Sequence, residues 1–418
     1  MSRIGIFCFF IIASMGAPFA VAADMLVDDV PIPADARVEV PLEVSETLSR
    51  FSGAWVGSWG DRLHHILIVE DISASGEAHV VYAVGNNGVK GVWRRLEATV
   101  SGNALTIDDT FNATYVLTSA DSLRATYRRG DAVGQATLSR IALTELMLPG
   151  AHVAWATPSE FLDTRLQEGG KPIRLEVVIK KPSGSGPFPL LVFNHGSTGR
   201  GTDSNLFTAT YASPQIADFF VEKGWIVAFP QRRGRGKSDG LYDEGFAPDR
   251  AQGYSCDSGR SLPGADRALD DIKAAVDALR QRSDVAAGRI LIGGISRGGV
   301  LAIAYAGMHP EQVLGVLNFV GGWMGEGCST AAEINGALFQ RGGKFGRPTL
   351  WLYGQHDRYY SIEHSRSNFD VFKKAGGNGE FFEYAVPGGI GHALLAYPNL
   401  WSGDVERYLT VIGALRAQ

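Results

Sequence analysis

The chain has 418 residues, of which 45% are hydrophobic and 20% are charged, and its formal net charge is −5. This composition is typical of a folded globular protein and excludes a disordered or collagen-like chain. The acidic balance, without a run of basic residues, disfavours nucleic acid and anionic membranes as partners. The length is sufficient for two or three domains.

Residues 1–22 have the pattern of a secretory signal peptide. Arg3 precedes the apolar stretch 4–15, and the small residues 20–22, Ala-Val-Ala, form a cleavage site. An uncleaved membrane anchor is the alternative, but the apolar stretch is shorter than the ~20 residues that a bilayer requires. We therefore expect a secreted or periplasmic protein that has no membrane contact after cleavage.

Residues 51–141 alternate apolar and polar side chains in short runs that are separated by turn residues. In the run 123–129, Leu123, Ala125 and Tyr127 point away from the Arg and Thr side chains between them. We expect an all-β accessory domain within 23–145, either a small antiparallel sandwich or a barrel. The expected strands are 64–72, 78–84, 104–107, 113–118, 123–129 and 136–141.

Residues 53–59, Gly-Ala-Trp-Val-Gly-Ser-Trp, are similar to the Gly-x-Trp start of lipocalin-like and avidin-like barrels. We expect Trp55 and Trp59 to belong to the core of the domain, with a ligand-binding barrel as the alternative. Three histidines of this region fit a strand surface or core better than a catalytic role: His64, His65 and His79.

From about residue 149 the pattern changes to apolar runs of four to eight residues that alternate with segments of helical spacing. Such runs are typical of strands buried on both faces of a parallel sheet, and the helices between them indicate right-handed β-α-β units. We expect this α/β domain to occupy 146–418, with its ligand at the carboxyl ends of the strands. The expected strands are 190–194, 225–230, 290–293, 313–320, 349–353 and 381–386.

Residues 294–298, Gly-Ile-Ser-Arg-Gly, lie between an expected strand and an expected helix. In this context Gly-x-Ser-x-Gly is a nucleophile elbow, because the glycines permit the sharp turn and the helix amino end favours a developing oxyanion. Ser296 is therefore the predicted nucleophile. Asp357 and His392 follow later strands, so the chain order is Ser, Asp, His. Glu326, after the preceding strand, is the alternative acid.

Five short segments carry a family resemblance: 193–197 (Phe-Asn-His-Gly-Ser), 233–238 (Arg-Gly-Arg-Gly-Lys-Ser), 294–299, 354–357 (Gly-Gln-His-Asp) and 391–392 (Gly-His). In this order they resemble α/β-hydrolases of the dienelactone hydrolase and prolyl oligopeptidase-like group over about 173–415. The resemblance implies a mostly parallel eight-stranded sheet flanked by helices, with Ser296, Asp357 and His392 as a catalytic triad. It also implies that the backbone N–H groups of Ser197 and Arg297 bind the oxyanion.

Two loops are expected at the carboxyl edge of the sheet, 240–263 and 323–346. Each carries one cysteine, Cys256 and Cys328, and an even pair in an exported protein predicts a disulfide. Two unpaired thiols are the alternative. Three further histidines are expected to make local contacts: His195, His356 and His364.

Three functional hypotheses remain open at this point. The first is an exported serine hydrolase that acts on a carboxylic ester, with a small-molecule ester or acyl compound as substrate. The second is a serine peptidase of the prolyl oligopeptidase-like type. The third is a catalytically silent hydrolase fold that binds a ligand. No cofactor or metal motif appears in the sequence.

Overall fold

The computed structural model describes residues 24–39, 44–59, 63–86, 90–130, 132–151, 153 and 159–415. The predicted signal segment 1–22 lies outside these residues. The chain divides into two compact units, Met1–Thr157 and Pro158–Gln418, which we call the N-terminal and C-terminal units. The predicted division between residues 145 and 146 falls within helix α2 (Leu143–Leu146), whose Leu146 is buried in the N-terminal unit.

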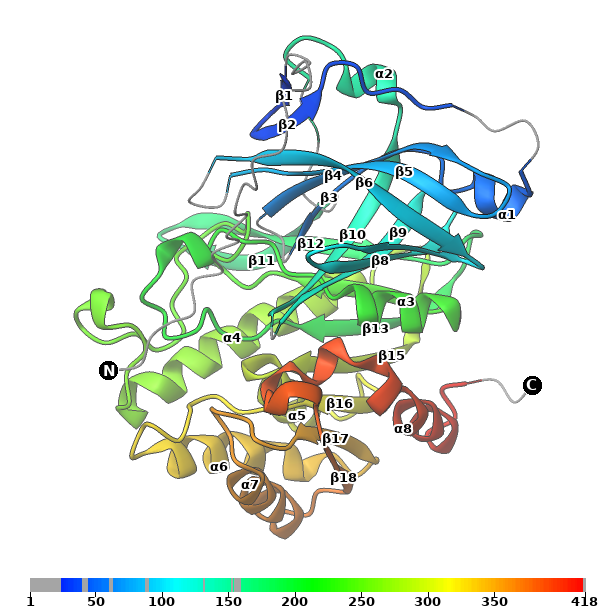
Figure 1. Cartoon of the computed structure of the whole chain (residues 1–418). Helices are drawn as coiled ribbons and strands as arrows, with labels where there is room; N and C mark the ends of the chain where they lie inside the picture. Colours follow the sequence, from blue (N-terminus) through cyan, green and yellow to red (C-terminus); the bar gives the residue numbers. More distant parts are fainter. Residues whose placement is uncertain are drawn as a thin grey trace. The chain divides into compact units, whose positions relative to one another are not determined.

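The N-terminal unit contains a closed antiparallel barrel of eight strands, so of the two expected forms the barrel is the one observed. The strands are β3 (Gly53–Trp59), β4 (Leu63–Ile72), β5 (Glu77–Val84), β6 (Val92–Ser101), β7 (Ala104–Asp108), β8 (Asn112–Ser119), β9 (Ser122–Arg129) and β10 (Ala132–Ile141). Each pairs with the next along the chain, and β10 closes against β3 (Figure 1). A Cβ at Gly57 would lie 2.2 Å from Thr137 O, so β3 and β10 approach too closely for a side chain there.

The inside of the barrel is filled by apolar side chains. Trp55 and Trp59 are both buried there, as expected for core residues. The indole N–H of Trp55 donates to Phe51 O at 2.9 Å, and the Arg140 guanidinium lies 4.0 Å from the centre of the Trp55 ring. A second apolar cluster on the outer face includes Leu146 and the hairpin β1 (Asp24–Val27) and β2 (Val30–Pro33). Helix α1 (Glu46–Ser49) precedes the barrel.

The three barrel histidines have structural partners. His65 is fully buried, with Nδ1 2.7 Å from Ala83 O and Nε2 2.9 Å from the Tyr115 hydroxyl. His64 and His79 each pair with an aspartate on a neighbouring segment. These contacts agree with the expected core and surface roles.

The C-terminal unit is built around an eight-stranded sheet. Its strands are β11 (Glu160–Glu168), β12 (Lys171–Lys180), β13 (Phe188–Asn194), β14 (Ile226–Pro230), β15 (Val285–Ile295), β16 (Gly315–Phe319), β17 (Thr349–Gly354) and β18 (Gly379–Tyr384). They lie in the order β11-β12-β14-β13-β15-β16-β17-β18. β12 is antiparallel to both of its neighbours, and the other neighbouring pairs are parallel. This is the mostly parallel sheet of an α/β-hydrolase fold.

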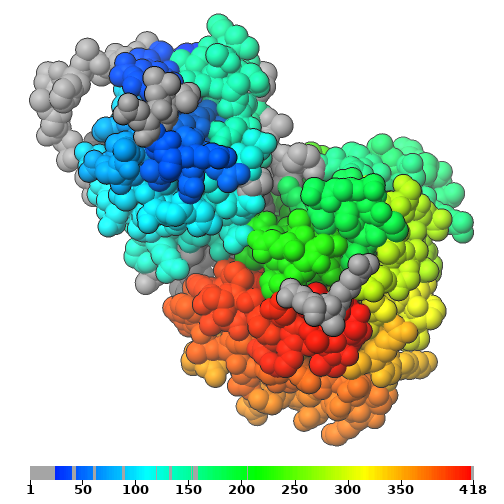
Figure 2. All heavy atoms as spheres, turned by 90° about the vertical axis from the view of Figure 1, so that its right-hand side faces the viewer, coloured from blue at the N-terminus to red at the C-terminus, as the bar shows by residue number. Residues whose placement is uncertain are grey.

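Helices form two layers against this sheet (Figure 1). One layer holds α4 (Ser258–Leu279), α5 (Arg297–Met308), α6 (Ala331–Arg341) and α7 (Ile362–Lys374), each in contact with the next. The other holds α3 (Pro214–Glu222) and α8 (Pro398–Val411), whose Phe219 and Trp401 rings are 5.3 Å apart. Figure 2 shows α8 (red) beside α3 (green) on the surface of this unit. Short 3₁₀ turns occur at η1 (Ser204–Leu206), η2 (Arg250–Gln252), η3 (Gly342–Lys344), η4 (Pro387–Gly389) and η5 (Gly391–Ala396).

Helix α4 begins earlier than the sequence predicts. Asp257 Oδ1 accepts a hydrogen bond from the Gly259 N–H at 2.9 Å, which caps the helix at this point. The loop expected to extend to Pro263 therefore ends at Asp257. Pro263 lies inside the helix, near its amino end, where its missing N–H removes a single backbone hydrogen bond.

Among the described residues, no helix is both long and apolar enough to span a membrane.

Candidate active site

Ser296 lies at the sharp turn between β15 and α5. Its φ and ψ are 55° and −122°, a conformation that is strained for a residue with a Cβ. The glycines on either side allow the chain to pack tightly around it. A Cβ at Gly294 would lie 2.4 Å from the Gly298 backbone, and one at Gly298 would lie 2.1 Å from Asn194 O. The Gly-x-Ser-x-Gly segment thus has the strand-turn-helix context of a nucleophile elbow.

His392 and Asp357 form a hydrogen-bonded pair beyond the ends of two neighbouring strands. His392 Nδ1 lies 2.7 Å from Asp357 Oδ2. The Asp357 side chain is fully buried, and its Oδ1 accepts the N–H of Tyr359 at 2.8 Å, which fixes the carboxylate. Glu326, the alternative acid, instead accepts hydrogen bonds from the N–H and the hydroxyl of Ser361. The carboxylate bonded to His392 is therefore that of Asp357.

Tyr360 lies against the histidine. Its ring centre lies 5.8 Å from that of His392. Its hydroxyl donates to Gly322 O at 2.7 Å. Burial raises the pKa of Tyr360, so the phenol stays protonated. Sequence reasoning missed this residue, because an aromatic side chain three positions after the acid forms no distinctive pattern.

The loop after β13 runs beside the serine. A Cβ built on Gly196 would lie 3.2 Å from Ser296 Cβ and 3.7 Å from Ser296 Oγ. The next residue, Ser197, is one predicted oxyanion donor, and Arg297, directly after Ser296, is the other. The backbones of 196–197 and 296–297 are thus brought together at the amino end of α5.

Charged side chains are buried next to this loop. Glu244 Oε1 lies 2.5 Å from Arg232 Nε, and its Oε2 lies 3.2 Å from Arg297 Nη1. Each of these three side chains is at most 3% exposed. Burial acts to raise the pKa of Glu244, but Arg232 and Arg297 beside it hold that pKa below its ordinary value. Glu244 is therefore ionised. It lies in the loop 240–263 that is expected at the carboxyl edge of the sheet, but no sequence pattern singles it out.

Of the three further histidines, His195 and His364 make contacts as expected, whereas His356, for which a local contact is also expected, is exposed. His195 is buried and bonded to the Gly196 carbonyl oxygen, with Nδ1 2.8 Å away. His364 Nε2 lies 2.9 Å from the Asn335 amide. Within the part of the chain that the structure describes, no group of three or more His, Cys, Asp or Glu residues could hold a metal ion.

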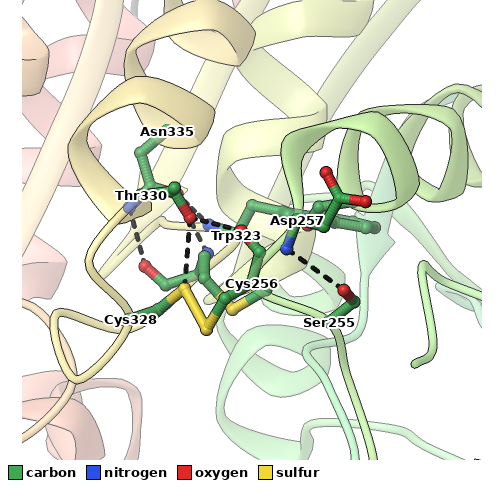
Figure 3. The surroundings of a disulfide bond; sticks show 9 residues. Ser255, Cys256, Asp257, Trp323, Cys328, Thr330 and Asn335 are labelled. Atoms are coloured by element: carbon green, nitrogen blue, oxygen red, sulfur yellow. Dashed lines mark hydrogen bonds between the residues drawn. A yellow bond between two sulfur atoms is a disulfide. The ribbon is translucent and has the colours of Figure 1, made fainter. Parts of the chain in front are cut away.

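Cys256 and Cys328 form the expected disulfide, with their Cα atoms 5.7 Å apart. Figure 3 shows that the bridge links the residues preceding α4 to those preceding α6. The Thr330 hydroxyl donates to Cys256 O, and Asn335 Oδ1 accepts the N–H of Trp323 at 2.8 Å. The two loops are thus joined by a covalent bond and by a hydrogen bond beside it.

A family model described as X-Pro dipeptidyl-peptidase (S15 family) matches residues 169–327. The matched segment contains Ser296 and ends before Asp357 and His392. No curated protein matches the chain.

Several solved structures are similar to part of the chain. An esterase from Pyrococcus furiosus is 14% identical, covers 60% of this chain and 89% of its own, and has a TM-score of 0.41. Est1E from Butyrivibrio proteoclasticus, bound to ferulic acid, is 17% identical with coverages of 54% and 89% and a TM-score of 0.38. A putative dienelactone hydrolase from Klebsiella pneumoniae is 16% identical with coverages of 62% and 99% and a TM-score of 0.39.

The order of the strands, the turn at Ser296 and the family match agree with the α/β-hydrolase fold for the C-terminal unit, the fold that the sequence resemblance implies.

Proposed function

We propose that the protein is an exported serine hydrolase that cleaves carboxylic esters through an acyl-enzyme intermediate. The observation that carries the proposal is the strained elbow at Ser296 together with the 2.7 Å bond between His392 Nδ1 and Asp357 Oδ2. A serine hydroxyl is a weak nucleophile unless a base takes its proton. By holding Nδ1–H of His392, Asp357 leaves Nε2 free to act as that base.

The reaction then runs in two steps. His392 Nε2 takes the proton from Ser296 Oγ as this oxygen attacks the ester carbonyl carbon, and the N–H groups of Ser197 and Arg297 stabilise the oxyanion. His392 next gives the proton to the departing alkoxide, which leaves as the alcohol. Water attacks the acyl-enzyme by the same route and releases the acid. Asp357 stabilises the imidazolium in both steps.

Kinetics on p-nitrophenyl esters test these roles. Ser296→Ala and His392→Ala are each expected to lower kcat by about 10⁶-fold, and Asp357→Asn by about 10⁴-fold, because the triad acts as a unit. Glu326→Gln is the matched control, since Glu326 bonds Ser361 and not His392. An unchanged kcat in Asp357→Asn together with a large fall in kcat in Glu326→Gln would reverse the assignment of the acid.

A serine peptidase is the second candidate, and the match to the X-Pro dipeptidyl-peptidase model favours it. A panel of p-nitrophenyl esters and X-Pro p-nitroanilides distinguishes the two. The ester proposal predicts turnover of the esters without release of nitroaniline. Turnover of the nitroanilides would favour the peptidase.

The proposal of export is supported by the signal pattern of residues 1–22 and by the disulfide between Cys256 and Cys328. Mass spectrometry of the protein from a bacterial host with an outer membrane is expected to find a mature chain that begins at Ala23, outside the cytoplasm. A chain that keeps Met1 and stays in the cytoplasm would contradict export.

A further inference from the structure

We propose that Glu244 is a positioning residue of the oxyanion hole, which acts on both backbone donors through Arg232 and Arg297. The inference rests on the proposed serine hydrolase function and deepens it, because it assigns a role to buried charges that the triad does not use.

The first connection leads to the N–H of Ser197. Arg232, paired with Glu244, donates from Nη1 to His195 O at 2.9 Å and from Nη2 to Gly196 O at 3.3 Å. The Gly196 carbonyl and the Ser197 N–H belong to one planar trans peptide and point in opposite directions. Holding the carbonyl oxygen against the buried guanidinium therefore fixes the direction of the Ser197 N–H.

His195 strengthens this connection. Its Nε2 accepts the backbone N–H of Arg232 at 3.2 Å, so in the neutral ring the proton is on Nδ1, which donates to Gly196 O at 2.8 Å. Burial, with Arg232 and Arg235 nearby, holds the pKa of His195 well below its ordinary value, so the ring is neutral. Hydrogen bonds to a carbonyl polarise the whole peptide. The Ser197 N–H thereby becomes a stronger donor.

A chain of hydroxyl groups leads from Glu244 to the other side of Ser197. The Tyr242 hydroxyl lies 3.0 Å from Glu244 Oε2 and 2.6 Å from the Tyr254 hydroxyl. Tyr254 in turn accepts the backbone N–H of Thr198 at 3.2 Å. The residues on both sides of Ser197 are thus linked to the same carboxylate.

The second connection leads to Arg297. Its Nη1 donates to Glu244 Oε2 at 3.2 Å and to Glu244 O at 3.1 Å, and its Nε donates to Trp323 O at 3.0 Å. The guanidinium also lies against the rings of Tyr254 and Trp323, at 3.6 and 4.1 Å from their centres. With its side chain held at so many points, Arg297 keeps its backbone N–H fixed at the first position of α5.

Without its charge, Glu244 would leave Arg232 and Arg297 as unpaired buried cations. A buried cation without its counter-charge costs free energy, so the guanidinium groups are expected to shift toward water and release the Gly196 carbonyl. The consequence for catalysis is a loss of transition-state binding at the oxyanion with little change in ground-state binding.

The test compares Glu244→Gln with wild-type protein in ester hydrolysis. We expect kcat to fall by about 10- to 100-fold while KM changes by less than about threefold. The affinity for a trifluoromethyl ketone, which forms a tetrahedral oxyanion on the serine, is expected to fall in parallel with kcat/KM. A general loosening of the fold would not produce this parallel.

Asp271→Asn is the matched control. Asp271 is a buried carboxylate whose Oδ1 lies 2.5 Å from Nε of Arg233, the residue next to Arg232. Unlike Arg232, Arg233 donates to the backbone carbonyl of Arg267 in helix α4 and not to the 195–198 loop. Its loss is expected to lower the melting temperature as Glu244→Gln does but to leave kcat within about twofold of wild type. An equal loss of kcat in Asp271→Asn would overturn the inference.

If Glu244→Gln does not fold, Arg232→Lys takes its place, because lysine keeps the positive charge but cannot donate to both carbonyls. It is expected to lower kcat about tenfold with KM unchanged. Unchanged kcat and unchanged ketone affinity in the folded variant would overturn the role of Glu244 and leave the proposed function intact. A folded wild-type protein that neither hydrolyses esters nor binds the ketone would instead overturn the proposed function, and the inference with it.

Discussion

His65 is a neutral histidine inside the barrel, where burial lowers its pKa to about 3. In the unfolded chain the same ring has its ordinary pKa of about 6.5. Below pH 6.5 this imidazole is therefore protonated in the unfolded chain but stays neutral in the folded barrel. The contribution of His65 to the free energy of unfolding is fully present above pH 6.5. It is lost as the pH drops toward 3, by about 1.4 kcal/mol per pH unit.

Urea unfolding of the whole chain at pH 6.5 and pH 5, with proteolytic fragments used to follow the N-terminal unit, measures this effect. Over this interval the free energy of unfolding of the wild-type barrel is expected to fall by about 2 kcal/mol more than that of His65→Gln. His79→Gln is the control, because the hydrogen bond that His79 donates to the Asp71 carboxylate raises the pKa of this exposed histidine and gives the opposite sign. Equal losses in wild type and His65→Gln would show that His65 does not cause the loss of stability.

The sequence predicts some of the site residues and misses others for a physical reason. Ser296 belongs to a local motif, and Asp357 and His392 each follow a buried strand directly, so chain order and spacing are enough to propose them. Glu244 and Tyr360 make their contacts with residues that are distant in the sequence, so no local pattern marks them. Common residue types become informative only when the fold brings them together.

The same distinction holds for secondary-structure elements. The parallel strands in the middle of the sheet are predicted because burial on both faces requires an apolar run. By contrast, β6 and β11 are missing from the expected strands, because one face of each is exposed and carries charged side chains. β12 is missing as well, since its Lys and Arg residues interrupt the apolar pattern. Pairing in hairpins, which a local pattern does not show, determines these three strands.

The disulfide joins two loops of the C-terminal unit and is expected to stabilise it. It closes a chain segment with a sequence separation of 72 residues, so its removal is expected to destabilise the C-terminal unit by up to about 4 kcal/mol in the chain-entropy model. The double variant Cys256→Ser/Cys328→Ser and the reduced wild-type protein are expected to have the same lowered midpoint in urea. Two free thiols in the unfolded, non-reduced wild-type protein would refute the bridge.

For the whole molecule, the change of pattern near residue 149 predicts an all-β part followed by an α/β part. The barrel has one buried inner core, and the C-terminal unit has a larger core around its sheet. The sandwich and the barrel have the same alternating pattern, so the sequence leaves that choice open. Closure depends on the close approach of β3 and β10, which are far apart in the chain.

The proposed function requires Ser296 to be an activated nucleophile. The most direct measurement is peptide mapping by mass spectrometry after the folded protein reacts with a fluorophosphonate, with Ser296→Ala as the control. We expect one label per chain, on Ser296, and none on the variant. A folded wild-type protein that remains unlabelled, or that carries its label on another residue, would contradict the proposed function.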